Sequence, residues 1–158
     1  MPDAYLSPTA LADLVDVHPD TLRNWRVHGL VDGYGRQAAN GYWWYSIRDA
    51  VAVWAGWKLI FEAKLRERAR ALNIAHAIAP DVVAAIRGAG PWRRFHASIY
   101  TDATAEGGTR GWEVWQGDDI RDLPVGALLV DNIINVEAFA AMVPVEIRDA
   151  ILGAAEEG

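Results

Sequence analysis

Apolar residues recur at helical spacing near the start of the chain, at Leu11, Leu14 and Val15. Ser7 stands before this pattern as a candidate N-cap, and Pro8 suits the first helical position, where a missing N–H costs no hydrogen bond. The pattern therefore predicts a short helix that begins just after Ser7 and buries its leucine side.

A second short helix is predicted over residues 19–28, after a link whose length fits a helix-turn-helix. Pro19 suits its first position, and Gly29 ends it, as a glycine just past the last turn commonly does. The stripe expected to face inward consists of Leu22, Trp25 and Val27. The side chains expected to point outward belong to Thr21, Arg23, Asn24, Arg26 and His28.

The outward set of this second helix favours contact with DNA. Arginine can bind the edge of a guanine or a phosphate, and asparagine can pair with adenine. We therefore expect the helix to lie in a major groove, with Thr21, Arg23 and Asn24 at or near bases. Arg26 and His28 are expected at the sugar–phosphate backbone or the minor groove beside it.

Residues 31–45 predict a small β hairpin, because glycines and Asn40 mark a turn and the aromatic residues after it have strand character. A helix-turn-helix followed by a hairpin is a winged helix. Arg36 and Tyr42 of this hairpin are expected to contact the DNA backbone or the minor groove beside it. The residues of this region expected to be buried are Leu22, Trp25, Leu30, Tyr42 and Trp44.

A third helix is predicted after the hairpin, because Ser46 and Asp49 have the spacing of a capping box. Apolar residues keep helical spacing beyond it, which predicts one helix from about 47 to 72. The next segment is a weaker helix or a connection, and Pro80 is expected to open another short helix that ends at Gly88.

In the last part of the chain the apolar pattern alternates with period two, which is typical of strands. Residues 92–100 and 112–116 are expected to pair as a hairpin around a polar loop, and residues 125–130 to form a third strand. Asn135 is expected to cap a helix, and a last helix is expected after Pro144.

The predicted fold class is mainly α with a small β wing. An N-terminal winged helix-turn-helix domain is expected over 1–90, followed by a small acidic α+β module over 91–158. The net charge of −6 is unevenly distributed: residues 1–94 carry 12 Lys and Arg against 9 Asp and Glu, whereas residues 95–158 carry 3 against 12. Such asymmetry is typical of a domain that faces nucleic acid joined to another module, because backbone binding needs only a local basic face.

The composition excludes several kinds of site. The chain has no cysteine, which rules out disulfides and thiolate metal sites. No apolar run approaches the ~20 residues of a membrane helix, and residues 1–4 have neither a basic leader nor an apolar stretch. We therefore expect a cytoplasmic protein that does not enter a membrane.

No catalytic arrangement stands out in the sequence. The four histidines have no ligand spacing, and the Gly107-Gly108 pair lies between strands, which is the wrong context for a phosphate loop. His96 and Ser98 share one face of a strand without an orienting acid nearby in sequence. The acidic turn at 118–122 is expected to be solvated. These observations predict no enzymatic activity, no cofactor and no bound metal.

Several landmarks in the first third of the chain occur in the order typical of one family of DNA-binding domains. They are Thr21-Leu22-Arg23, Gly29-Leu30, Gly41-Tyr42, Tyr45-Ser46 and Asp49-Ala50-Val51. In these residues the chain resembles MerR-type regulators and their excisionase-like and phage winged-helix relatives. The family usually has arginine directly after the Gly-Tyr pair, where it meets the DNA backbone. This chain has Trp43 there, so the resemblance implies that Arg36 or Arg48 takes that contact.

We therefore predict a sequence-specific double-stranded DNA-binding protein, specifically a MerR-like transcriptional regulator. Single helix-turn-helix units usually act as dimers on paired half-sites, so a homodimer is expected. The helix at 47–72 or the C-terminal module would form the dimer, or that module would bind an effector or a partner protein.

Two alternatives stay open. Phage and mobile-element proteins, such as small terminase subunits and excisionases, and antitoxin-type regulators also join winged helices to unrelated C-terminal modules. A protein-interaction module that does not bind DNA is favoured by Trp43 and by the acidic total charge.

Overall fold

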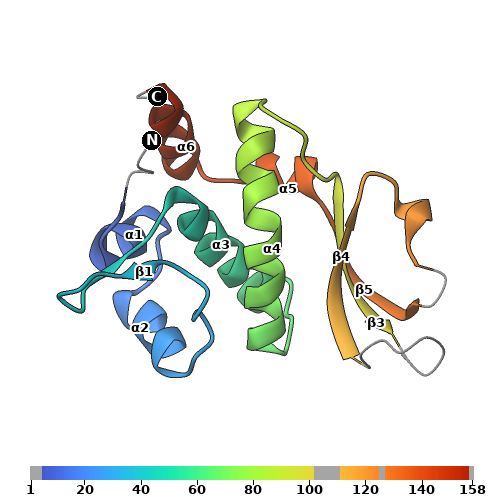
Figure 1. The fold of residues 1–158 in the computed structure, drawn as a ribbon, viewed down its shortest axis with the longest axis horizontal. Helices are drawn as coiled ribbons and strands as arrows, with labels where there is room; N and C mark the ends of the chain where they lie inside the picture. Colours follow the sequence, from blue (N-terminus) through green and yellow to red (C-terminus); the bar gives the residue numbers. More distant parts are fainter. Residues whose placement is uncertain (1–4, 102–110, 125–126, 157–158) are drawn as a thin grey trace.

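A computed structural model describes residues 5–101, 111–124 and 127–156 (Figure 1). Within them the protein has a mixed α+β fold, about half helical, with two small antiparallel sheets. Three expectations concern residues outside the described ones. They are the expected lack of a basic or apolar leader in residues 1–4, the polar loop at 102–110 with its glycine pair, and Val125 and Gly126 of the third strand.

The first two helices form where the sequence predicts them. Their bounds are Pro8–Leu14 for α1 and Pro19–Val27 for α2. The Ser7 hydroxyl accepts the Ala10 N–H at 3.2 Å, and His18 Nδ1 accepts the Asp20 N–H at 3.2 Å. Each helix therefore begins at a side chain that satisfies one of its free N–H groups. Gly29 follows α2 with φ of 67°, a left-handed conformation that glycine adopts at little cost.

The predicted hairpin forms as two short antiparallel strands, β1 (Arg36–Gln37) and β2 (Trp43–Trp44). Directly after β2, Tyr45 makes an isolated bridge with Leu6, with reciprocal backbone hydrogen bonds of 2.7 and 2.9 Å. This bridge attaches the base of the hairpin to the segment that precedes α1.

α3 (Ile47–Trp57) begins at the predicted capping box. The Ser46 hydroxyl accepts the Asp49 N–H at 3.2 Å, and the Asp49 carboxylate accepts the Ser46 N–H at 2.7 Å. Two backbone N–H groups are thereby satisfied reciprocally, which confirms the position of this helix start.

The single helix expected over 47–72 is wrong. The chain leaves α3 through a π-helical turn, η1 (Lys58–Glu62), and Lys64 then takes φ of 58°. The Leu65 N–H donates to the Leu59 carbonyl at 2.9 Å, and both side chains are buried. Because Leu65 still faces the core, the apolar spacing continues through the turn, and periodicity alone does not reveal the break.

The separate helix expected to open at Pro80 is also wrong, because α4 (Arg68–Arg87) is one helix of 20 residues. Proline inside a helix removes one hydrogen bond. Here Pro80 lies on the exposed side, while Ala79 and Val82 beside it are buried. Tertiary packing of the opposite face thus keeps the helix continuous until Gly88, which ends it with φ of 62°.

The second sheet has the order β4-β3-β5, and both pairings are antiparallel. Its strands are β3 (Phe95–Thr101), β4 (Gly111–Gly117) and β5 (Ala127–Asn135). The predicted pairing of the first two strands is confirmed, with Ala97 opposite Trp115. The third strand runs further than 125–130, and its register shifts around Asn132, which has φ of 52°.

The 3₁₀ turn η3 (Ile120–Asp122) lies between β4 and β5. Two helices follow the sheet, α5 (Val136–Ala141) and α6 (Val145–Glu156). As predicted, the Asn135 side chain caps α5 by accepting the Ala138 N–H at 3.2 Å.

α4 lies at the centre of the molecule, between α3 and the three-stranded sheet (Figure 1). It also packs against α5 and α6. One hydrophobic cluster extends from Leu11 of α1 to Ile151 of α6. Contacts of α4 therefore cross residue 90, the boundary between the two domains expected from the sequence.

By length and composition alone, α4 is long and apolar enough to cross a membrane. The core helix of a protein passes the same test. Because Leu72, Ile74 and Ile78 are fully buried, the central position of α4 accounts for its apolar character.

Three residues expected in the core lie at the surface instead. The exposed fractions are 74% for Val27, 66% for Tyr42 and 37% for Trp44. Val27 is on the last turn of α2, and each strand of the hairpin has only two residues, with Tyr42 just before the second strand and Trp44 in it. Leu22 and Trp25 are confirmed as core, with 3% exposed each, and Leu30 is half-buried.

Candidate nucleic-acid interface

The outer face of α2 presents polar side chains to solvent. Arg23 and Asn24 are exposed, and their side chains make no hydrogen bond or ion pair within the part of the chain that the structure describes. Thr21 is half-buried, and His28 is exposed at the C-cap of the helix. Two of the predicted base-reading side chains are thus free to meet a ligand.

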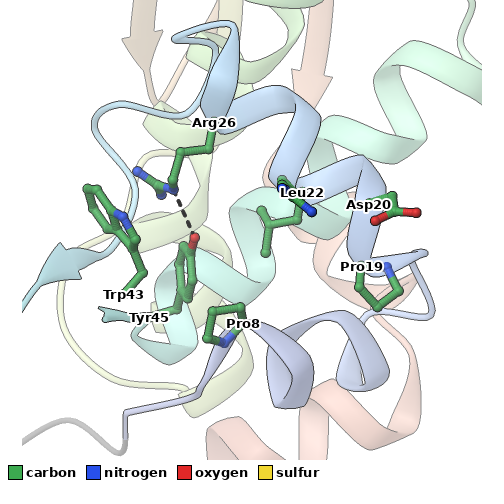
Figure 2. A pocket seen from close by; sticks show the side chains of 8 residues that line it. Pro8, Pro19, Asp20, Leu22, Arg26, Trp43 and Tyr45 are labelled. Atoms are coloured by element: carbon green, nitrogen blue, oxygen red, sulfur yellow. Dashed lines mark hydrogen bonds between the residues drawn. The ribbon is translucent and has the colours of Figure 1, made fainter. Parts of the chain in front are cut away.

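Arg26 does not point outward, so that expectation is wrong. Its Nε donates to the Tyr45 hydroxyl at 3.1 Å and its Nη2 donates to the Tyr34 carbonyl at 2.8 Å. The guanidinium carbon lies 3.5 Å from the centroid of the Trp43 ring. Figure 2 shows this side chain turned from α2 toward Trp43 and Tyr45. Arg26 is therefore already engaged by contacts with the hairpin and the loop before it.

The two phenols near Arg26 keep their protons. Burial raises the pKa of Tyr34, and the nearby Asp49 carboxylate raises it further. Burial also raises the pKa of Tyr45, partly offset by the hydrogen bond and the positive charge of Arg26. Protonated Tyr34 donates its hydroxyl to the Leu72 carbonyl of α4 at 2.6 Å, which links this region to the central helix.

A groove of about 400 Å³ opens between the first turns of α1 and α2 and the second strand of the hairpin (Figure 2). Its apolar walls are Pro8, Pro19, Leu22, Trp43 and Tyr45. Asp20, Arg23 and Arg26 also line it, so the groove is continuous with the outer face of α2.

The hairpin places further predicted residues at the surface. The Arg36 guanidinium lies 3.9 Å from the centroid of the Tyr5 ring. Tyr42 is exposed at the turn, where its N–H donates to the Asn40 side chain at 3.2 Å. Arg48 is exposed on the first turn of α3, and among the described residues it has no hydrogen-bond or ion-pair partner. Residues 18–48 hold four arginines and two aspartates.

The contact between Trp43 and Arg26 was not predicted from the sequence. In the sequence, Trp43 was singled out only as an aromatic residue at a position where arginine was expected. An arginine on the preceding helix paired with an unexpected tryptophan in the hairpin was the available signal, since the two side-chain types stack readily.

The acidic turn is held by neighbouring arginines. Asp118 pairs with Arg93 at 2.9 Å, and Asp119 pairs with Arg121. Arg121 lowers the pKa of Asp119 through this contact. Within residues 5–101, 111–124 and 127–156, no three His, Asp or Glu side chains gather as a metal site would require.

The fully buried His96 has an acidic partner that sequence spacing did not reveal. Its Nε2 lies 2.7 Å from an Asp81 oxygen on α4, and its Nδ1 is buried without a partner in the described structure. Ser98 is also buried, and the described contacts include no hydrogen bond between it and His96.

Comparisons of the chain with protein-family models, curated proteins and solved structures found no match.

Proposed function

We propose that the protein binds double-stranded DNA in a sequence-specific manner and acts as a transcriptional regulator. α1, α2 and the β1–β2 hairpin form a winged helix-turn-helix in this proposal, with α2 in a major groove. The observation that carries it is the pair of exposed, unengaged side chains, Arg23 and Asn24, on the outer face of α2. These side-chain types recognise guanine and adenine edges in that groove.

The charge distribution supports the same interpretation. Residues 18–48 carry four arginines, on α2, β1 and the first turn of α3, although the whole chain has a net charge of −6. Phosphate contacts require such a local basic surface. Arg36 and Arg48 are the candidates for these contacts, together with Tyr42 at the exposed hairpin turn.

A homodimer is part of this proposal. One winged helix-turn-helix buries little surface on DNA, and a dimer bound to two half-sites gains the affinity that a single unit lacks. The module over residues 91–158 would provide the dimer contact or bind an effector or partner protein. Proteins of phages and mobile elements, including terminase small subunits, excisionases and antitoxin-type regulators, would use the same DNA-binding surface for another process.

A second candidate function is docking of a protein partner without DNA. The apolar walls of the groove and the exposed Val27 favour this function. An apolar side chain of a partner protein would be removed from water against these surfaces, which would stabilise the complex. Such a contact need not weaken steeply with salt.

The experiment that separates these functions is selection from a pool of random double-stranded DNA at two salt concentrations, followed by sequencing. An enriched palindrome, retained less at high salt, would support the dimeric sequence reader. Salt-sensitive retention without enrichment would favour a packaging or architectural role. Absence of retention at low salt would contradict DNA binding and leave the protein-docking function.

A further inference from the structure

Arg26 joins the helix that carries the candidate DNA contacts to the hairpin that follows it. Its guanidinium carbon lies 3.5 Å from the ring centroid of Trp43, a distance at which the cation stacks on the ring face. Two of its N–H groups donate to the Tyr45 hydroxyl and the Tyr34 carbonyl. One side chain of α2 thus contacts β2, the residue after β2 and the loop that precedes β1.

Besides Arg26, the hairpin is held by the buried Tyr45 after β2 and by Arg36 of β1, whose guanidinium lies over the Tyr5 ring. Each of its strands has only two residues, and an isolated two-stranded hairpin is marginal in water. Its base is attached through the bridge between Tyr45 and Leu6, but Tyr42 and Trp44 beyond that bridge are exposed. Trp43 is half-buried, and the face of its ring is covered by Arg26.

Arg23, one helical turn earlier, provides the contrast. It lines the same groove as Arg26, but its side chain has no hydrogen-bond or ion-pair partner among the described residues. The two arginines therefore have different tasks: Arg23 is available to a ligand, whereas Arg26 is engaged within the protein.

We propose that Arg26 is a positioning residue that fixes the β1–β2 hairpin against α2 by stacking on Trp43, and that it does not contact DNA. That Arg26 makes no DNA contact rests on the proposed function, whereas its contact with the hairpin does not. Because the hairpin turn and α2 must reach the DNA together, the Arg26–Trp43 pair sets the angle between them.

The first arm of the test measures the hairpin in the full-length free protein. The reporter is the Ala38 amide, which donates to the Tyr42 carbonyl at 2.8 Å, followed by NMR hydrogen exchange. Arg26→Ala and Trp43→Ala are each expected to speed its exchange by about fivefold, and the double variant by little more than either alone. Arg23→Ala, the matched control, is expected to leave exchange unchanged. Unchanged exchange in Arg26→Ala and Trp43→Ala would overturn the proposal.

The second arm measures DNA binding as a function of salt, on DNA retained by the wild-type protein. Arg26→Ala and Trp43→Ala are expected to weaken binding by similar factors and to keep the salt slope. Arg26→Lys is the decisive variant, since lysine keeps the charge but lacks the planar guanidinium that stacks and donates to two acceptors. Arg26→Lys is expected to lose nearly as much affinity for DNA as Arg26→Ala.

A phosphate contact by Arg26 would give the opposite pattern. Arg26→Lys would then retain binding, and Arg26→Ala alone would reduce the salt slope by about one. That result overturns the proposed role of Arg26. If the wild-type protein binds no DNA, the proposed function fails by itself, and the hydrogen-exchange arm still decides whether Arg26 holds the hairpin.

Discussion

His96 Nε2 lies 2.7 Å from Asp81 Oδ2, and this contact joins β3 of the sheet to the central helix α4. The imidazole is fully buried, and burial lowers its pKa below the usual 6.5, with the Asp81 hydrogen bond and charge opposing the shift. The neutral ring therefore persists in the folded protein at pH values where an exposed histidine begins to take up a proton.

This relationship predicts that stability falls as the pH drops below about 6.5. In this pH range His96 takes up a proton in the unfolded chain but stays neutral in the folded protein. The free energy of unfolding therefore falls by up to about 1.4 kcal/mol for each pH unit. Urea unfolding at pH 7.5, 6.5 and 5.5 measures the slope. His96→Gln keeps an N–H donor for Asp81 but cannot titrate, and its slope should be shallower. Equal slopes in the two proteins would contradict this origin of the pH dependence.

Gly56 of α3 should resist substitution because it lies against α4. A Cβ added at Gly56 would lie 2.5 Å from Leu72 Cδ2, and Leu72 is fully buried, so the core would have to shift around the new methyl group. Gly56→Ala should therefore lower the free energy of unfolding by about 1–3 kcal/mol. Gly153→Ala in α6 meets no atom within 4 Å and should instead raise it by about 0.5–1 kcal/mol. Urea denaturation of both variants checks the prediction, and changes of the same sign would refute it.

The buried hydroxyl of Tyr34 should contribute measurably to stability. It donates to the Leu72 carbonyl at 2.6 Å, while the ring stacks on His76 with centroids 5.0 Å apart. Tyr34→Phe keeps the ring and removes the hydrogen bond, which should lower the free energy of unfolding by about 0.5–1.5 kcal/mol. Tyr42→Phe at the exposed turn serves as the control and should leave it unchanged. A loss in Tyr42→Phe as large as that in Tyr34→Phe would show that the hydrogen bond is not the cause.

Under the proposed function, Arg23→Ala should cost about 1–3 kcal/mol of DNA affinity and relax sequence preference, because a base contact is lost. Arg36→Ala should weaken binding evenly across sequences, as loss of a phosphate contact does. Arg66→Ala removes the same charge from an exposed position outside the candidate interface and is the matched control. Quantitative binding to a selected site and to shuffled DNA distinguishes the three. The groove-reading role of α2 fails if Arg23→Ala and Arg36→Ala behave like Arg66→Ala.

Much of the local structure was predictable because the relevant contacts are close in sequence. Ser7, the Ser46–Asp49 pair and Asn135 each cap the helix that follows them, and these contacts span three residues. The alternation in β3 and β4 likewise identifies paired strands. Of the candidate site, the exposure of Arg23 and Asn24 follows from helical spacing in α2.

The missed features depend on residues far apart in sequence. Nothing near Pro80 indicates that α4 continues through it, because the buried face of the helix is paired with α3 and with the sheet. Asp81 meets His96 only after the chain has turned from α4 into β3.

The sequence by itself determined the starts of α1, α2, α3 and α5, the small hairpin and the pairing of β3 with β4, because these follow from backbone hydrogen bonding and short-range periodicity. Only the tertiary structure decided which arginine is free. Arg23 and Arg26 lie three positions apart on one helix, yet one faces solvent and the other stacks on Trp43, 17 positions later in the chain. That difference arises from packing, since a side chain takes the partners that the fold brings within reach.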